Sequence, residues 1–240
     1  MRTSDRDTLL FFLAMTAGSS DGWSYFGLGH AFVANMTGNT VLVGVAVFDK
    51  SEGIVRPLLS LVCYLAGVVA AAFLNRHVRQ GSIWSRATTI TMMIEAVLIA
   101  GAEVAWVALR MHGVKELFAL LGCLAFAIGL QSGAMLQLKI PGAVTTYITG
   151  TWTNLISGLA RLPNSKKPQE PNQKVQFAER LIVHGGILAV YILAAVLTGW
   201  VFVHQPLAAG ALAAASVWTV ALYAAFSKGD SSDVSNKKLS

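Results

Sequence analysis

Charged side chains are scarce in this chain of 240 residues, because Asp, Glu, Lys and Arg together make up 12% of it. Soluble globular domains carry about 25% charged residues, so the composition excludes an ordinary soluble domain. Four segments have no charged residue at all, namely 57–74, 117–138, 185–203 and 205–227. A helix needs about 20 mostly apolar residues to span a bilayer, so each segment has the length to span or nearly span a membrane.

Cysteine and catalytic motifs are equally sparse. The two thiols, Cys63 and Cys123, lie in apolar segments without a CxxC or Cys/His spacing, so we interpret them as small packing residues. The five histidines also lack the spacing of a metal site. The chain has no HExxH motif, no Gly-x-Ser-x-Gly motif and no phosphate-binding Gly-Lys-Ser/Thr loop. We therefore predict no enzyme, no cofactor and no metal.

The net charge of +6 does not indicate a nucleic-acid partner. The basic residues lie in expected loops and tails rather than in a patch interleaved with aromatic residues. Lys and Arg in such loops set the orientation of membrane proteins. The partner that we expect is therefore the lipid bilayer.

More apolar segments complete the pattern. Residues 87–109 contain only Glu95 and Glu103 as charged residues, and residues 9–20 continue past Asp21. Backbone polar groups in lipid must be hydrogen-bonded within the protein, so we predict an all-α, polytopic transmembrane helix bundle. It forms a single membrane domain over residues 1–228, and the polar tail 229–240 is expected to be a disordered cytoplasmic segment.

Two stretches of the chain are similar to each other. Gly-Ser-Ser-Asp-Gly at 18–22 is followed by Asn-Met-Thr-Gly-Asn at 35–39, and Gly-Leu-Gln-Ser-Gly at 129–133 is followed by Tyr-Ile-Thr-Gly-Thr at 147–151. The copies of the glycine motif and the copies of the Thr-Gly pair are separated by the same interval to within a single residue. We predict two internal repeats, 8–110 and 117–227, with a longer cytoplasmic loop at 161–180.

The number of spans depends on the two short apolar runs, 33–48 and 144–160, that carry the Thr-Gly pairs. If they cross the membrane there are eight spans, and if they do not there are six full spans plus two short segments. Both arrangements place 14 Lys and Arg in the cytoplasm and 4 outside, with both termini cytoplasmic. A helix over 33–48 would be about 24 Å long, short of a hydrocarbon core of about 30 Å, which favours six spans.

Ionisable residues at membrane depth are candidates for function because a buried charge is costly. Asp21 is expected either to bind a cation or proton or to be a structural acid that caps a broken helix. Glu95 is a candidate proton relay, and it faces either the bundle interior or the membrane interface.

The starts of the two short segments are the predicted substrate or ion site. A helix N-terminus with a positive dipole end suits an anion, whereas Thr and Asn oxygens beside a glycine break suit a small cation. The structural alternative is N-capping and helix packing. Besides Asp21, the candidate binding residues are Asn35, Thr37, Gly38, Asn39, Gln131, Thr146, Thr149, Gly150 and Thr151.

These motifs resemble the YoaK family of bacterial inner-membrane proteins. The resemblance rests on Asp21-Gly22, on residues 32–39 and 129–131, and on Thr-Thr-Tyr-Ile-Thr-Gly at 145–150, and it extends to residue 226. It implies the bacterial cytoplasmic membrane and about six helices, but no substrate. Ser132 departs from the Asn that the family usually has there, which weakens an amide-specific role.

Two classes of function follow. The leading hypothesis is a small-solute or ion-coupled secondary transporter, acting alone or as a homodimer, with its site between the two Thr-Gly motifs. The alternative is a membrane scaffold or assembly partner that transports nothing, in which the small residues build helix interfaces.

Overall fold

A computed structural model describes residues 3–49, 52–78, 84–109, 113–137, 148–161 and 171–226. Helices account for nearly all of these residues and none of them is in a strand, which confirms the all-α prediction. The helices are α1 (Thr3–Gly27), α2 (Met36–Asp49), α3 (Val55–Leu74), α4 (Arg86–Leu109), α5 (Val114–Gln137), α6 (Ile148–Arg161), α7 (Pro171–His204) and α8 (Ala211–Phe226). Short 3-10 turns occupy Glu52–Ile54 and Pro206–Ala208.

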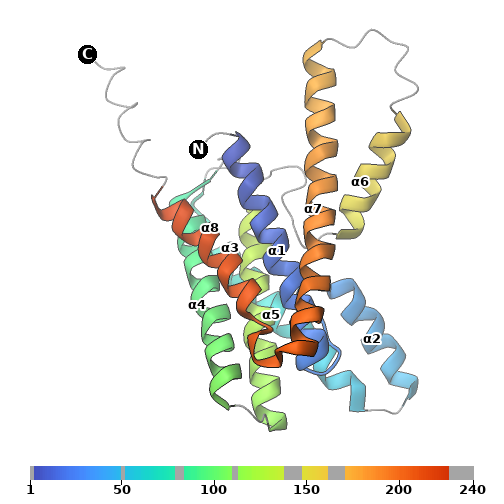
Figure 1. Cartoon of the computed structure of the whole chain (residues 1–240), viewed down its shortest axis with the longest axis vertical. Helices are drawn as coiled ribbons and strands as arrows, with labels where there is room; N and C mark the ends of the chain where they lie inside the picture. The colour runs from blue at the N-terminus through green and yellow to red at the C-terminus, as the bar shows by residue number, and fades with distance from the viewer. Residues whose placement is uncertain are drawn as a thin grey trace.

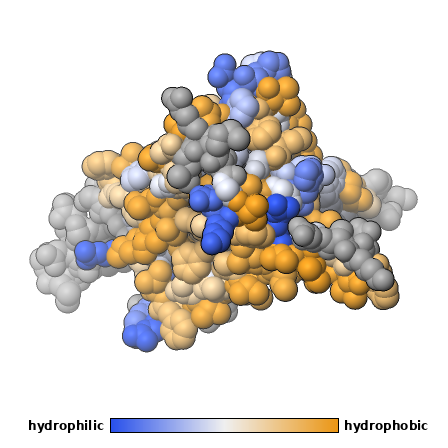
Figure 2. Space-filling view, turned by 90° about the horizontal axis from the view of Figure 1, so that it is seen from below, coloured by the Kyte–Doolittle hydropathy of each residue, from blue (hydrophilic) through white to orange (hydrophobic). Residues whose placement is uncertain are grey.

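Five stretches of helix are long and apolar enough to cross a membrane, judged by length and composition. They are Val55–Leu74, Arg86–Ala108, Val114–Leu136, Leu181–His204 and Pro206–Phe226. Apolar side chains also cover most of the face seen in Figure 2. Large exposed side chains such as Leu193, Val203 and Phe226 are what lipid rather than water would cover. The chain is a polytopic helical membrane protein.

Helix α7 begins earlier than expected. It starts at Pro171, so residues 171–180 are helical although we predicted a loop over 161–180. Proline favours the first position of a helix because its fixed φ suits the helix and its missing N–H would have no partner there. Residues 162–170 and 229–240 lie outside the described residues.

Helices α1, α4, α5 and α8 form a closed ring. Helix α1 packs against α8, α8 against α4, α4 against α5, and α5 against α1. Helix α7 packs along α1 on the outside of this ring, and α3 packs along α5. Figure 1 shows that α1, α4 and α7 run in one direction while α3, α5 and α8 run in the other. Helix α1 begins and α8 ends at the same end of the bundle.

Glycines bring two of these helix pairs into backbone contact. A Cβ atom at Gly18 would lie 2.3 Å from the carbonyl oxygen of Tyr191, and one at Gly129 would lie 2.2 Å from that of Tyr64. One turn further on, Gly22 faces Ala195 and Thr198 of α7, and Gly133 faces Val68 and Ala71 of α3. Small residues that allow such close approach are typical of helix interfaces in membranes.

The two short helices lie apart from the ring. Helices α2 and α6 have 14 residues each, and α2 packs mainly on α3 while α6 packs on α7. In Figure 1 they lie on the same side of the bundle, where both begin near its middle and run toward opposite ends. Their N-terminal ends are thereby brought close together.

Candidate functional site

Asp21 fixes the segment that leads into α2. Its Oδ1 atom accepts hydrogen bonds from the backbone N–H groups of Val33 at 2.8 Å, Ala34 at 2.7 Å and Asn35 at 3.4 Å. Its Oδ2 atom accepts a hydrogen bond from the hydroxyl of Tyr191. The side chain is 3% exposed, so a buried carboxylate joins α1, the entry to α2, and α7.

Two asparagines then shape the start of α2. The Oδ1 atom of Asn35 accepts a hydrogen bond of 3.0 Å from the N–H of Gly38, which makes Asn35 the N-cap of the helix. The amide of Asn39 folds back to Phe32, from whose N–H it accepts at 3.0 Å and to whose carbonyl it donates at 2.7 Å. The hydroxyl of Ser60 on α3 donates to the same carbonyl at 2.5 Å. The loop is therefore held from both sides.

A cavity of about 290 Å³ lies between the starts of the two short helices. Its lining comes from the entry to α2, the first turn of α6 and one tyrosine each from α3 and α7. The residues are Ala34, Asn35, Met36, Thr37, Tyr64, Ile148, Thr149, Gly150 and Tyr191. The two Thr-Gly motifs, which lie in different halves of the sequence, thus meet in one cavity.

Some of the predicted site residues line this cavity and others do not. Asn35, Thr37, Thr149 and Gly150 line it. Asp21 lies behind the wall and reaches it through Tyr191. Thr146 lies outside the described residues.

The remaining predicted site residues do not line the cavity. Asn39 is buried against the loop backbone, and Gly38 lies against Phe32, whose ring would be 3.0 Å from an added Cβ. The Nε2 atom of buried Gln131 donates to the carbonyl of Leu13 at 3.2 Å. Thr151 is 3% exposed, and Glu95 lies on α4, in the ring.

Tyr64 and Tyr191 are site residues that the binding-site prediction missed. They begin the similar tetrapeptides Tyr-Leu-Ala-Gly and Tyr-Ile-Leu-Ala, one in each predicted repeat. That similarity was the available signal, because a tyrosine inside an apolar run is otherwise hard to distinguish from one at a membrane interface.

The cavity has a mixed polar and apolar lining, and none of its described lining residues is charged. Its walls offer two tyrosines, two threonines, an asparagine and the first turns of two helices, whose N–H groups carry partial positive charge. No group of three or more His, Cys, Asp or Glu side chains that could hold a metal ion occurs among the described residues. Hydroxyl, amide and backbone N–H groups of this kind can bind a small polar or anionic solute.

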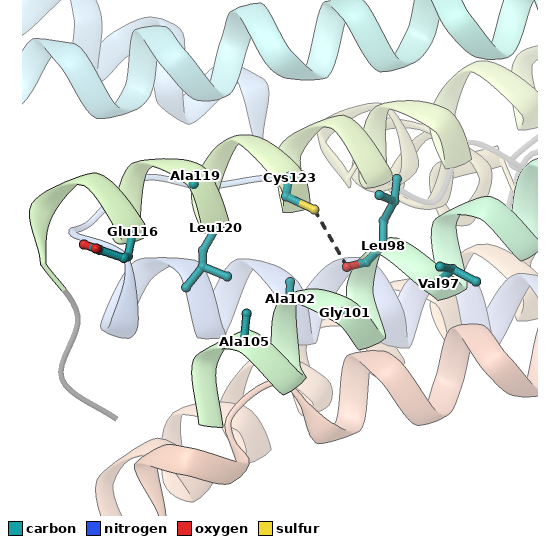
Figure 3. A pocket seen from close by; sticks show the side chains of 9 residues that line it. All are labelled: Val97, Leu98, Gly101, Ala102, Ala105, Glu116, Ala119, Leu120 and Cys123. Carbon is teal, nitrogen blue, oxygen red and sulfur yellow. Dashed lines mark hydrogen bonds between the residues drawn. The ribbon is translucent and has the colours of Figure 1, made fainter. Parts of the chain in front are cut away.

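Two apolar grooves also lie among the described residues. One of about 350 Å³ lies between α4 and α5 and is lined in part by Gly101, Ala102 and Ala119, with Glu116 at one end (Figure 3). A second of about 380 Å³ continues along α4 to Thr89 and Ala225, and the two share Val97 and Leu98.

Comparison with known proteins decides the family. Residues 9–225 match the family described as "Protein of unknown function (DUF1275)". The chain belongs to this family. It is also 29% identical over 194 residues to the UPF0700 transmembrane protein YoaK of Bacillus subtilis (strain 168), a match that covers 80% of this chain and 82% of the relative. No solved structure matches the chain.

Membership in the DUF1275 family confirms the resemblance seen in the sequence. The relative is described as a transmembrane protein, in agreement with the apolar helices of this chain. The family itself brings no substrate, so the function has to be argued from the cavity.

Proposed function

We propose that this protein is a small-solute secondary transporter of the bacterial inner membrane, with its substrate bound between the starts of α2 and α6. The observation that carries the proposal is the cavity that both Thr-Gly motifs and both tyrosines line. Transporters commonly bind substrate where two broken helices present their N-termini near the middle of the membrane. Nothing in the cavity suggests catalysis, so we also propose that the protein is not an enzyme.

Internal duplication is the second part of the proposal, and the helix packing supports it. In the two proposed repeats, α1 corresponds to α5, α3 to α7 and α4 to α8. The packed helix pairs correspond in the same way: α1 packs on α7 as α5 packs on α3, and α1 packs on α8 as α5 packs on α4. The glycine contacts follow the same exchange. Gly18 and Gly129, which correspond in the two repeats, meet the carbonyls of Tyr191 and Tyr64, which begin the similar tetrapeptides.

Six full spans with two half-length helices fit this arrangement best. Helices α1 and α5 run in opposite directions, as inverted repeats require, and so do α2 and α6 (Figure 1). With six spans the two termini lie on the same side of the membrane. The distribution of Lys and Arg makes that side the cytoplasm.

We further propose that the substrate is a small anion or carries a carboxylate. The first turns of α2 and α6 both face the cavity, and the ends of two helix dipoles favour negative charge there. Asp21 would be the coupling acid. Its bond to Tyr191 connects it to the cavity wall, so a change in its charge would be felt at the substrate.

The test starts from binding, because a ligand that binds the folded state alone stabilises it by about 2.7 kcal/mol at 100 times its Kd. Purified protein is heated with a panel of inorganic anions and small carboxylates. At least one should raise Tm, and the rise should be lost in the double variant Thr37→Val/Thr149→Val. Thr40→Val is the matched control, because the hydroxyl of Thr40 is exposed and donates to the carbonyl of Met36 in its own helix.

Uptake of that solute into proteoliposomes then separates transport from mere binding. The wild type should accumulate it when an ion gradient is imposed, and Asp21→Asn should still bind but no longer accumulate it. If no solute stabilises the protein, or if the double variant responds as the wild type does, the cavity is not the site. Binding without transport would favour a scaffold or assembly partner instead.

A further inference from the structure

Glu95 is fully buried in the middle of α4, and no described residue donates a hydrogen bond to either of its carboxyl oxygens. This distinguishes it from Asp21, whose carboxylate has four donors, and from Glu103, which accepts a bond of 3.0 Å from the N–H of Gly210. A carboxylate without partners in an apolar interior is so costly that such a group is normally neutral.

The side chain lies on a buried face of α4 that also contacts the end of α3, where the Nδ2 atom of Asn75 donates to the hydroxyl of Thr91 at 3.0 Å. Thr91, Met92 and Ile99 lie on the same face of α4, and all three are fully buried. Across the ring, the hydroxyls of Thr16 on α1 and Ser216 on α8 form a buried hydrogen bond of 2.8 Å. Together with the hydroxyl of Thr91, one turn earlier on α4, these two hydroxyls are buried polar groups of the bundle core.

Two contacts of α5 give the register. The Sγ atom of Cys123 on α5 lies 3.8 Å from the carbonyl oxygen of Leu98 on α4 (Figure 3), and Glu95 lies three residues before Leu98. Gln131 on α5 contacts Leu13 on α1, and Thr16 lies three residues after Leu13. Helix α5 is antiparallel to both α1 and α4, so Glu95 and Thr16 lie opposite positions of α5 that are two residues apart. At about 1.5 Å per residue, the two side chains begin at heights along the bundle axis that differ by about 3 Å.

Among the described residues, no basic side chain on the helices packed against α4 lies near the middle of that helix, where it could neutralise Glu95 as an ion pair. On α5 the charged residues of the described part, Lys115 and Glu116, lie in the first turn, and α8 has none within Ala211–Phe226. The other titratable groups of α5, α8 and α3 are Cys123, Tyr223, Cys63, Tyr64 and, in the first turn of α3, Arg56. Arg86 begins α4, more than two turns before Glu95, and the titratable residues of α1 are Asp5, Arg6, Asp7, Asp21 and Tyr25. On α4 itself Glu103 lies two turns away and bonds to Gly210.

We propose that Glu95 is a proton-binding site in the core of the bundle, at the level of the Thr16–Ser216 pair and separate from the cavity. The carboxyl group holds the proton as a neutral acid, because none of the described residues donates a hydrogen bond that would stabilise its charge. The inference does not rest on the proposed transport function, because it concerns the state of one side chain in the resting protein.

A proton suits this site better than a metal cation. Hard cations need several oxygen ligands at once. The hydroxyls of Thr16 and Ser216 lie within hydrogen-bonding distance of each other and of the carbonyls of Phe12 and Ala213. Glu95 belongs to no group of three or more His, Cys, Asp or Glu side chains among the described residues, and a single carboxyl group is sufficient to bind a proton.

Infrared spectroscopy of the purified protein in lipid tests the proposal directly. Wild-type protein with ¹³C-labelled glutamate should show, at mildly alkaline pH, the carbonyl stretch of a protonated acid that shifts with the label. The band should be absent in Glu95→Gln. Glu103→Gln is the matched control, because it removes a carboxyl from the same helix, and there the band should persist.

The labelled wild type keeps the test decisive even if Glu95→Gln does not fold. Absence of any protonated glutamate band in the wild type would overturn the proposal, and so would a band that survives in Glu95→Gln or disappears in Glu103→Gln. A Tm that rises with sodium in the wild type but not in Glu95→Gln, without an acid band, would replace the proton by sodium and also overturn it.

Discussion

The hydroxyl of Tyr191 donates a hydrogen bond to Asp21, a residue 170 positions earlier in the chain. Tyr191 lines the cavity, whereas Asp21 holds the backbone of the entry to α2. One wall of the candidate site and the start of one short helix are therefore coupled through a single carboxylate.

Removal of this hydrogen bond should destabilise the protein. Tyr191→Phe leaves a buried carboxylate oxygen without its donor, at a cost of about 1.5–3 kcal/mol. We expect a clear fall in Tm in detergent, whereas Tyr223→Phe on the exposed side of α8 should change it little. In the double variant Asp21→Asn/Tyr191→Phe the two losses should not add, because both remove the same contact. Additive losses would contradict the coupling.

The glycine contacts should be intolerant of a single methyl group. Gly18→Ala and Gly129→Ala each place a Cβ within 2.3 Å of a backbone oxygen on the neighbouring helix, so the helices must separate. We expect losses of about 1–3 kcal/mol or more, measured by thermal unfolding.

Gly44→Ala and Gly101→Ala are the matched controls, because an added Cβ there meets nothing within 4 Å. Alanine is favoured over glycine inside a helix by about 1 kcal/mol, so these variants should be neutral or slightly more stable. Equal losses at all four positions would mean that the helix contacts are not what makes glycine necessary.

Glu103 should act as a cap for α8 from a neighbouring helix. Its Oε2 atom accepts from the N–H of Gly210, directly before α8, and the indole of Trp106 donates to the carbonyl of Pro206 at 2.9 Å. Loss of a cap costs about 0.5–2 kcal/mol, so Glu103→Ala should lower Tm while Glu103→Gln, which keeps an acceptor, should lower it less. The opposite order would show that the charge matters more than the hydrogen bond.

Thiol labelling can decide the number of spans. With six spans a single cysteine at Ser82, between α3 and α4, is cytoplasmic and should resist an impermeant reagent in intact cells, while one at Gly113 should react. The background carries replacements of Cys63 and Cys123. Eight spans predict the reverse, so ready labelling at Ser82 with protection at Gly113 would exclude the inverted arrangement.

Features that depend on the local sequence could be predicted, whereas features that depend on contacts between distant residues could not. The helical fold and the meeting of the two Thr-Gly motifs followed from long apolar runs and a repeated spacing, both of which can be read directly along the sequence. Asn39 belongs to the same motif as Thr37 but turns to Phe32, because the loop before α2 closes over it. That closure depends on Ser60 and Asp21, and no spacing within the motif encodes it.

Tyr64 and Tyr191 line the cavity although the sequence motifs did not indicate them, because packing between distant helices decides their orientation. Which face of α3 or α7 points at the cavity is set by the glycines of α5 and α1 that pack against them. The sequence contains both partners, but the register between helices that are distant along the chain is a property of the packed bundle alone. The start of α7 at Pro171 is different, because the preference of proline for that position could have been applied beforehand.

The main partners of α1 are α7 and α8, which lie at the other end of the chain. During synthesis the first helix therefore leaves the ribosome long before the surface that covers Asp21 and Gly18 exists. Domains generally fold as their chain emerges, and exposed surfaces that wait for a partner are prone to misassembly. In this protein the surface of α1 stays unpaired until α7 and α8 have been synthesised. Early termination of translation should therefore leave α1 inserted but without its main packing partners.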